Sequence, residues 1–327
     1  MSGIGRKLVA CWLAPFFVMT ALAAAPARAA DYPERPIHIV VPTGAGGITD
    51  VLARIIADKL SNEVGQGVVI DNKPGASGII GSTYVARAAP DGYTLLFAYP
   101  THALNPSLFA KLPYDTLNDF TPVTMVGILP TVLVVEAGSP AKDIRGLIAM
   151  AKEKPGSLGY SSVGNGSLGF VAAELLAMDA GIKLTQIAYR GTPQAVMGLL
   201  SGDTALFFDA PLTILPLIDS GKVRALGVTS KSRLPSLPDV PAIDEVVPGY
   251  EALGWNGILA PAGTPPAIVD RLNKLIAKIL KTPDVAQQLA DKGIQVVGGT
   301  PQEFATVIKA DIEKWGAVVK AAGITAQ

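Results

Sequence analysis

Hydrophobic and polar positions follow two patterns along the chain, one typical of buried strands and one typical of amphipathic helices. PIHIVV at 36–41 predicts a strand. A helical pattern starts at Thr49 and places one set of apolar residues on a single face: Val51, Leu52, Ile55, Ile56 and Leu60. Strand and helix patterns then alternate through GVVID, residues 79–88 and YTLLFAY. This succession predicts βαβ units and a mainly parallel sheet.

A second series of the same kind begins after a break in the alternation. The segments VTMVGI and TVLVVE predict strands with little helix between them. From Ile144 the alternation resumes through a helix, LGYSS, FVAAELLAM, LTQIAY, AVMGLL, TALFF, PLTILPLI and VRALGV. The strand GWNGILA and three helical stretches, near 265–280, 284–292 and 301–320, complete the chain.

These two series predict an α/β fold of the two-lobed, Venus-flytrap kind, in which each lobe is a mainly parallel sheet flanked by helices. We expect residues 30–128 and 252–327 to form lobe 1 and residues 129–251 to form lobe 2, with two hinge strands joining them. Such an architecture closes around a ligand.

The first 29 residues have the form of an export signal. Arg6 and Lys7 precede an apolar run over residues 8–25, and Ala27-Arg28-Ala29 has the small-x-small form that a signal peptidase cuts. A retained membrane anchor is the alternative, because the apolar run is almost long enough to span a bilayer. The cleavage pattern favours removal, so we expect a periplasmic protein.

Removal of 29 residues from 327 leaves 298, and the chain's single cysteine, Cys11, leaves with the signal. The exported protein therefore depends on its hydrophobic core instead of disulfides. It has 24 basic and 27 acidic residues, a net charge of −3. This balance does not favour a nucleic-acid partner, and we expect a monomer.

Glycine-rich turns follow several of the predicted strands: GAGG at 44–47, PGASG at 74–78, GNGSLG at 164–169 and RGTP at 190–193. Ligands of open α/β sheets lie at such turns. Glycine, serine and threonine supply N–H and O–H donors there, and the helix from Thr49 adds its positive end, so the turns suit a carboxylate. Arg190 can add a charge-assisted contact.

GNGSLG also has the spelling G-x-G-x-x-G of a dinucleotide site. The next strand, however, ends in Ala188-Tyr189-Arg190 and has no acid for the ribose hydroxyls, so only an NADP-type site would be consistent with it. A tight turn needed only for packing is the other alternative. We predict no cofactor and no metal.

Three further polar residues have alternative explanations. Asp209 ends the strand LFFD and either caps the next helix or faces the ligand. His102 follows another strand and is either a pocket residue or an ordinary loop residue, whereas His38 lies inside a strand and is expected to be structural.

Catalytic motifs give little support to an enzyme. The chain has no H-E-x-x-H, and Ser167 has Asn165 where a G-x-S-x-G motif needs its first glycine. A Ser-His-Asp set would have to recruit His102 from a distance. An exported hydrolase of small acids or esters remains the alternative to a binding protein.

Eight segments together are far more specific than any one glycine loop: VPTGAGGITDVLAR at 41–54, DNKPGASGIIG at 71–81, AAPDGYTLL at 88–96, NDFTPV at 118–123, YRGTPQAV at 189–196, GKVRALGVTS at 221–230, LPDVPAIDE at 237–245 and LAPAGTPPAIVDRLN at 259–273. With them the chain resembles the solute-binding proteins of tripartite tricarboxylate transporters, the periplasmic Bug receptors. The resemblance implies a two-lobed receptor that closes on a small carboxylate, with membrane transporter subunits as its partner.

Carried onto this sequence, the resemblance implies a set of ligand-binding residues from both lobes: Thr43, Ala45, Gly46, Gly47, Ala76, Ser77, Gly78, Thr101, His102, Gly164, Asn165, Gly166, Ser167, Arg190, Gly191, Thr192 and Asp209. The chain departs from the family at Thr43-Gly44-Ala45, where Phe or Tyr and then Ala-Pro is common. It departs again at Phe170, where a histidine is common. We include Phe170 in the site and expect a ligand with an apolar or aromatic body behind its carboxylate.

Overall fold

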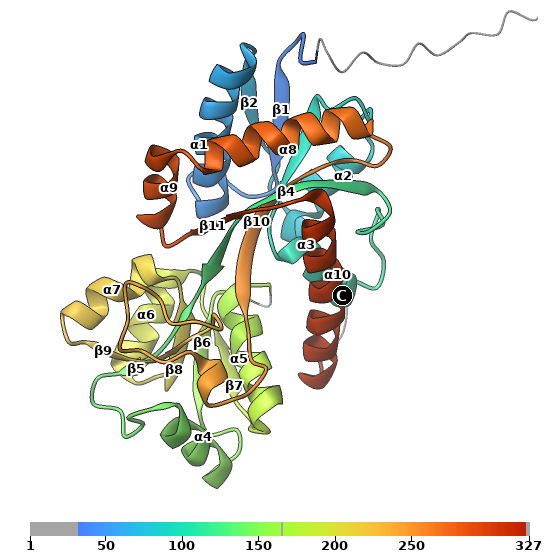
Figure 1. Cartoon of the computed structure of the whole chain (residues 1–327). Coiled ribbons are helices and arrows are strands. Elements are labelled where there is room, and N and C mark those ends of the chain that lie inside the picture. Colours follow the sequence, from blue (N-terminus) through green and yellow to red (C-terminus); the bar gives the residue numbers. More distant parts are fainter. Residues whose placement is uncertain (1–31, 165, 325–327) are drawn as a thin grey trace, which may run out of the picture.

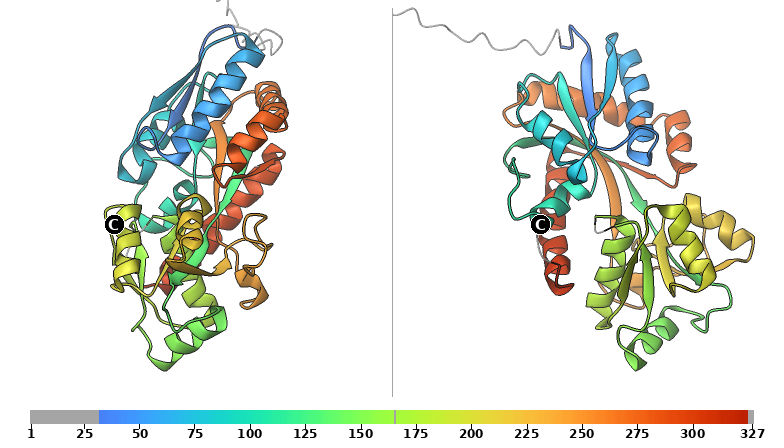
Figure 2. Two further views of the ribbon diagram at one scale, coloured as in Figure 1. Left: turned by 90° about the vertical axis from the view of Figure 1, so that its left-hand side faces the viewer. Right: turned by 180° about the vertical axis from the view of Figure 1, so that it is seen from behind.

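The computed structural model describes residues 32–164 and 166–324, which form two α/β lobes, one above the other in Figures 1 and 2. The predicted export signal at 1–29 and the predicted site residue Asn165 lie outside the described residues. Within the described part of the chain, no helix is long and apolar enough to cross a membrane.

Six strands of the described residues form the sheet of lobe 1, in the order β11-β4-β10-β3-β1-β2. Their bounds are β1 Ile37–Val41, β2 Val68–Asn72, β3 Thr94–Ala98, β4 Phe120–Pro130, β10 Leu253–Pro261 and β11 Gln295–Gly298. β1 is parallel to β2 and to β3, whereas β10 is antiparallel to β3 and β4, and β11 is antiparallel to β4. The sheet is therefore mixed, because β10 and β11 run in the direction opposite to that of β1, β2, β3 and β4.

Helices cover both faces of this sheet. Their bounds are α1 Ile48–Val64, α2 Ile79–Ala86, α3 Thr101–Leu108, α8 Pro266–Leu280, α9 Pro283–Ala290 and α10 Pro301–Ala321, with a 3₁₀ turn η1 Ala76–Gly78 before α2. Ile37 and Ile39 of β1 pack in the cluster that α1, α8 and α9 cover, and Val40 packs in the opposite cluster with α2 and α10. The residues of β1 thus alternate between the two clusters, as expected for a strand that is covered on both faces.

Lobe 2 has a second mixed sheet, of order β7-β6-β8-β5-β9. Its strands are β5 Val132–Glu136, β6 Gly159–Ser162, β7 Thr185–Ala188, β8 Leu206–Asp209 and β9 Val223–Val228, and its helices are α4 Ile144–Glu153, α5 Leu168–Ala180, α6 Thr192–Ser201, α7 Pro211–Asp219 and the 3₁₀ turn η2 Ile243–Glu245. β6 is parallel to β7 and β8, whereas β5 is antiparallel to β8 and β9. Leu133 and Val135 pack on the α4 and α5 side, and Val132 and Val134 pack on the α6 and α7 side.

The lobes are joined at a point where two chain segments lie side by side. β4 leads into β5 through Thr131, and the chain returns from lobe 2 into β10 at Leu253. Thr131 N–H donates to Thr229 Oγ1 at 2.7 Å, and Ala252 N–H donates to Thr229 O at 3.0 Å. We propose this junction as the hinge, with lobe boundaries at 128/129 and 251/252.

α10 contacts both lobes. Phe304 and Ile308 in its first half pack in the core of lobe 1. Trp315, Val318 and Val319 in its second half pack with α5 in the core of lobe 2. Figure 1 shows the helix running from the first lobe down beside the second. The C-terminal helix is thus a third connection between the lobes, made by side-chain packing and by a hydrogen bond from Lys314 Nζ to Glu251 O at 3.3 Å.

Two local features differ from the sequence pattern. Residues 101–108 form α3, a helix that lies in the break between the two predicted series. The helix accommodates Pro106 because it is only eight residues long and ends two residues later, so few backbone hydrogen bonds are lost. β11 was not predicted, because a four-residue strand gives no usable periodicity.

Gly169 marks a close approach of α5 to β8. A Cβ atom built on Gly169 would overlap the backbone carbonyl oxygen of Phe208, which cannot turn away as a side chain can. We expect Gly169→Ala to lower the free energy of unfolding by about 1–3 kcal/mol, measured by urea denaturation. Gly166→Ala is the matched control, because its Cβ would meet only Thr101 Cγ2, at 3.7 Å. Equal losses in the two variants would contradict this explanation.

Candidate functional site

The predicted loops gather at two facing sheet edges. β1, β2 and β3 are parallel, so the loops after them lie at one edge of lobe 1, and β6, β7 and β8 place their following loops at one edge of lobe 2. Such carboxyl-end edges are where α/β proteins bind ligands. The edges meet closely, because a Cβ on Gly166 of lobe 2 would lie 3.7 Å from Thr101 Cγ2 of lobe 1.

A cavity of about 190 Å³ lies between the lobes at this contact. Polar groups come from the first turns of α1 and α3, the loop before α5 and the crossing strand β10: Thr49, Thr101, Gly166, Ser167 and Asn256. Aromatic and aliphatic side chains form most of the rest, with Ile48, Tyr99, Pro100, Leu104, Leu129, Leu168, Val171, Gly254, Trp255 and Trp315. Most of the cavity wall is therefore apolar, and the hydrogen-bond donors are confined to the few polar residues named above.

The GAGG loop lies at the rim of the cavity, directly before Ile48 and Thr49. Residues 44–47 are exposed, and Gly46 has a left-handed φ of 84°. Gly46 N–H does not serve a ligand, because it donates to Asp50 Oδ2 at 2.8 Å. The same oxygen accepts from Arg54 Nε at 3.0 Å. Asp50 thus holds the loop against the first turn of its own helix.

Asn72 ties the Asp50 group to β2. Asn72 Nδ2 donates to Asp50 Oδ1 at 2.9 Å and to Thr43 O at 3.2 Å, and Arg54 donates to Asn72 Oδ1 at 3.1 Å. The hydrogen bond from Arg54, aided by Gly46 N–H and Asn72, lowers the pKa of Asp50 to about 2, against the opposing effect of burial. Asp50 is therefore ionised near neutral pH. Its carboxylate holds the GAGG loop, and both carboxylate oxygens already accept hydrogen bonds.

The Ala76–Gly78 loop has three consecutive residues in the left-handed region, with φ of 46° at Ala76, 52° at Ser77 and 84° at Gly78. Two of the three are not glycine, so the loop stores some backbone strain. Ser77 O accepts from Asn105 Nδ2 at 3.1 Å, which ties the loop to α3.

His102 lies behind the cavity wall. Its ring is 3% exposed, stacks on Tyr114 at 5.9 Å between centroids and meets Phe120 edge-on at 4.8 Å. Neither ring nitrogen has a hydrogen-bond partner among the described residues. Burial lowers the pKa of His102 to about 4. The structure therefore does not place His102 in the cavity, because α3 turns only Thr101 and Leu104 toward it.

In the GNGSLG loop, Ser167 caps α5. Its Oγ donates to Gly164 O at 2.8 Å and accepts from Phe170 N–H at 3.3 Å. The Phe170 ring is 1% exposed and belongs to the core of lobe 2, so the apolar wall of the cavity on this side comes from Leu168 and Val171 instead.

The RGTP loop stands apart from the cavity lining. Arg190 is exposed, its backbone N–H donates to Gln194 Oε1 at 3.2 Å, and its guanidinium makes no ion pair with the described residues. Gly191 and Thr192 begin α6 and likewise lie outside the lining.

Asp209 lies in a smaller cavity of about 100 Å³, which shares Leu129, Ser167 and Leu168 with the larger one. It does not cap α7, whose N-cap is Ala210. Its Oδ1 accepts from Ala210 N–H at 2.8 Å, and its buried Oδ2 has no hydrogen-bond partner among the described residues. Burial raises the pKa of Asp209, and the Ala210 N–H and the hydroxyls of Thr213 and Thr192 offset part of this effect.

The structure thus brings together four of the predicted residues, Thr101, Gly166, Ser167 and Asp209, as lining of the two cavities. The other described ones lie in the same edge loops or behind them: Thr43, Ala45, Gly46, Gly47, Ala76, Ser77, Gly78, His102, Gly164, Phe170, Arg190, Gly191 and Thr192. Sequence reasoning missed Thr49, Asn256 and two tryptophans, Trp255 and Trp315. The only available signal for Trp255 and Asn256 was their position on GWNGILA, the strand predicted to return from lobe 2.

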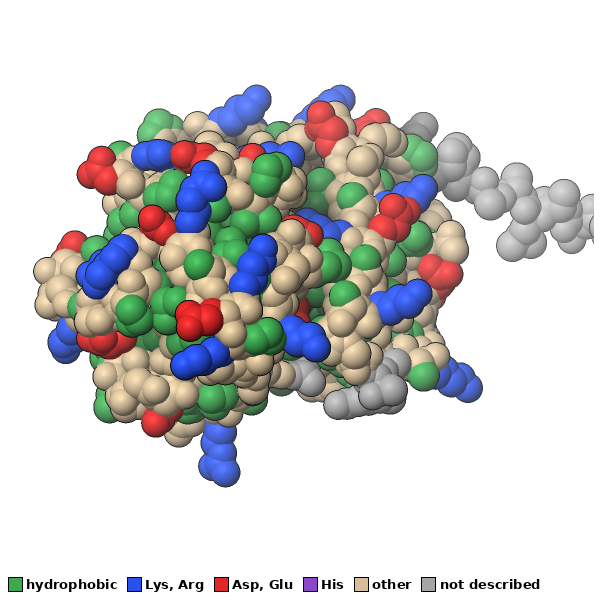
Figure 3. Space-filling model, turned by 90° about the horizontal axis from the view of Figure 1, so that it is seen from below, with side chains coloured by type: hydrophobic (Ala, Val, Ile, Leu, Met, Phe, Trp, Pro, Cys, Tyr) green, Lys and Arg blue, Asp and Glu red, His purple; other side chains and the backbone are tan. Residues whose placement is uncertain are grey.

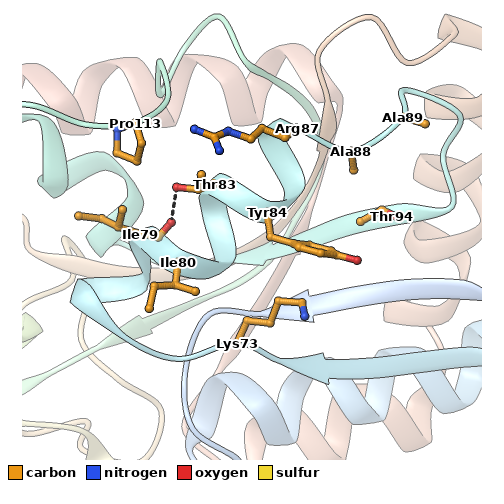
Figure 4. Close-up of a pocket in the computed structure, with 10 residues that line it drawn as sticks. All are labelled: Lys73, Ile79, Ile80, Thr83, Tyr84, Arg87, Ala88, Ala89, Thr94 and Pro113. Atoms are coloured by element: carbon orange, nitrogen blue, oxygen red, sulfur yellow. Dashed lines mark hydrogen bonds between the residues drawn. The ribbon is translucent and has the colours of Figure 1, made fainter.

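A larger hollow, of about 1000 Å³, lies on the outside of lobe 1 beside α2 (Figure 4). It is open and is lined by lobe 1 alone, with Lys73 Nζ 4.2 Å from the centroid of the exposed Tyr84 ring. No group of three or more potential metal ligands occurs among the residues that the structure describes. The cavity between the lobes is therefore the better candidate for ligand binding.

Comparison with known proteins agrees with this choice. The chain is 41% identical to the UPF0065 protein in the tcbD-tcbE intergenic region of Pseudomonas sp. (strain P51), over 96% of this chain and 94% of that protein. Its structure is similar to that of R. palustris Rpa4515 with adipate, with a TM-score of 0.77, 36% identity and coverage of 90% of this chain and 100% of the other. The periplasmic binding protein BugD gives a TM-score of 0.74, with 34% identity over 90% of this chain and 100% of that one.

The family model described as tripartite tricarboxylate transporter family receptor, TctC, matches residues 52–324. This match extends from α1 to the end of α10 and so includes both lobes. With the two-lobed fold and the interlobe cavity, it confirms the family that the sequence motifs indicated. The chain belongs to the tripartite tricarboxylate transporter receptor family.

Proposed function

We propose that this protein is a periplasmic receptor that binds a small carboxylate between its lobes and delivers it to the membrane subunits of a tripartite transporter. One observation carries the proposal: the N-termini of α1 and α5, from opposite lobes, border the same cavity. Helix N-termini offer unpaired N–H groups and positive dipole ends, which favour an anion. Membership of the family and the adipate bound to Rpa4515 support a carboxylate.

The ligand that we propose is a dicarboxylate or an aromatic carboxylate. Trp255 and Leu104 in lobe 1 and Val171 in lobe 2 give the cavity an apolar body. Burying apolar ligand surface against such side chains contributes about 25 cal/mol per Å². A strongly hydrated ligand such as citrate would leave its polar groups without partners there and would bind less well.

The proposed activity includes no covalent chemistry. A hydrolase of the serine type would need a histidine within hydrogen-bond reach of its nucleophile. His102 is enclosed by Tyr114 and Phe120, and its nitrogens make no hydrogen bond with any described residue.

Binding is proposed to close the lobes about the junction at Thr131 and Thr229, as a ligand that contacts both lobes favours the closed form. Closure would also bring the exposed Arg190 nearer to the ligand. We propose that the receptor acts as a monomer. On the face in Figure 3, acidic and basic side chains are interspersed, and this distribution gives no reason to propose nucleic acid as a partner.

A thermal-shift and calorimetry panel tests the proposal. Adipate, benzoate and citrate are compared, and the recovered compounds are identified by mass spectrometry. We expect at least one of the first two, at about 100 times its Kd, to raise the melting temperature by about 5 °C and to be recovered unchanged. Equal affinity for citrate and benzoate would contradict the apolar cavity, and a chemically changed compound would indicate the hydrolase.

Arg190→Ala is measured in the same panel. We expect weaker binding of the ligand with the melting temperature of the free protein unchanged, because the guanidinium makes no ion pair that the fold would lose. Unchanged affinity would remove Arg190 from the site.

A further inference from the structure

The smaller cavity beside Asp209 differs chemically from the larger one. Its polar lining comes from the junction between the lobes and from three loops or strand ends of lobe 2: Thr131, Ser162, Ser167 and Asp209. Because Leu129, Ser167 and Leu168 line both cavities, the smaller one adjoins the larger as a side chamber of about 100 Å³. The two cavities are thus neighbours, separated by no more than these shared side chains.

The Asp209 carboxylate has one oxygen in use and one without a partner. Oδ1 accepts from Ala210 N–H, whereas the buried Oδ2 has no partner within hydrogen-bond distance among the described residues, although the hydroxyls of Thr213 and Thr192 lie near enough to lower the pKa of the carboxyl. A buried acceptor without a donor is costly, and more so when it carries charge. Such groups in native proteins usually have a partner or a function.

Of the three hydroxyls that line the chamber, those of Thr131 and Ser167 are engaged as donors, and that of Ser162 is engaged as an acceptor. Ser162 Oγ accepts from Gln186 Nε2 at 2.7 Å, and Thr131 Oγ1 lies 3.3 Å from Thr229 Oγ1. Ser167 caps α5. These contacts fix the chamber walls but leave Asp209 Oδ2 as the strongest acceptor in it.

We propose that this chamber is a subsite for a hydrogen-bond donor, a hydroxyl or an ammonium group, at the end of the ligand remote from its carboxylate. The inference rests on the proposed carboxylate-binding function. It also adds a restriction, because a second ionised carboxylate in the chamber would face the Asp209 carboxylate at short range. A cationic group or a neutral hydrogen-bond donor is favoured opposite the Asp209 carboxylate, and a second anion is disfavoured. Of the two kinds of ligand proposed above, the subsite therefore favours the aromatic carboxylate over the dicarboxylate, and the preferred ligand is a monocarboxylate with an apolar body and a terminal donor.

A series of acids with one body and different ends tests the subsite by calorimetry: hexanoate, 6-hydroxyhexanoate, 6-aminohexanoate and adipate. A second pair, benzoate and 4-hydroxybenzoate, repeats the comparison on an aromatic body. In the wild-type protein we expect the better of the two donor-bearing hexanoates to bind at least tenfold more tightly than hexanoate, and adipate to bind no better than hexanoate. The hydroxyl and ammonium arms decide which donor the subsite takes.

In Asp209→Asn, the tenfold gain in affinity from a terminal donor should fall to less than threefold. The affinity for adipate should rise relative to that for hexanoate. Asp219→Asn is the matched control, since Asp219 is an exposed acid of the same lobe and the charge change is equal. It should keep the wild-type order. The wild-type series tests the subsite even if Asp209→Asn does not fold.

The possible failures are distinguishable. If hexanoate or benzoate binds but a terminal donor gives no gain, the subsite is wrong and the receptor function stands. The subsite is also wrong if Asp209→Asn keeps the full preference. If none of these acids binds, the proposed function itself fails, and the inference with it.

Discussion

Replacing Asp50 by alanine is expected to lower the free energy of unfolding by about 3 kcal/mol and to weaken carboxylate binding at least tenfold. The carboxylate accepts from Gly46 N–H, Arg54 and Asn72, and two of these partners belong to different elements from Asp50. Hydrogen bonds that involve a charged group contribute about 1.5–3 kcal/mol each. We reduce their sum because Arg54 is half-exposed and can be hydrated again after the change.

The affinity for the carboxylate should fall together with the free energy of unfolding, because the same contacts hold the GAGG loop beside the N-terminus of α1. Urea denaturation measures the first effect and calorimetry with the best acid of the panel measures the second. Asp58→Ala is the control, since Asp58 is an exposed acid of the same helix. A variant at Asp50 that loses stability but binds normally would show that the network supports the fold and not the site.

Acidification from pH 6.5 to pH 4 is expected to remove about 3 kcal/mol of stability through His102 alone. In the unfolded chain this histidine takes up a proton below about pH 6.5, its ordinary pKa, whereas burial lowers the pKa of His102 to about 4 in the folded protein. The unfolded state therefore binds more protons throughout this window, so stability falls as the pH falls. Above pH 6.5, this loss of stability through His102 is absent. The difference between the two pKa values corresponds to about 3 kcal/mol.

The measurement is the free energy of unfolding as a function of pH, compared with that of His102→Phe. The phenylalanine variant keeps a ring against Tyr114 and Phe120 and has no proton to bind, so its stability should fall less over this window. Parallel curves for wild type and His102→Phe would assign the pH dependence to other groups.

Part of the candidate site could be predicted, because the turns that lead into α1 and α5 are local features of the sequence. A strand followed by glycines and an amphipathic helix predicts a helix N-terminus at the end of a strand, and α1 and α5 begin where this rule places them. The eight family segments then predicted which of these turns act together.

Other features depended on packing that no local pattern contains. His102 follows a strand, as a pocket residue would, but the formation of α3 turns its ring toward Tyr114 and Phe120. Phe170 seemed to face the ligand and instead lies in the core of lobe 2. Trp315 reaches the cavity from the last helix, because α10 packs on both lobes.

By itself, the sequence determined the family, the alternation of strands and helices, and the glycine-rich turns between them. These properties follow from periodicity, glycine positions and short motifs, which act over a few residues. Only the tertiary structure decided that Gly46 N–H belongs to Asp50, that two tryptophans line the cavity, and that Asp209 Oδ2 is left unpaired beside it. The physical reason is that hydrogen-bond satisfaction and cavity shape depend on groups far apart in the chain, and folding alone brings them together.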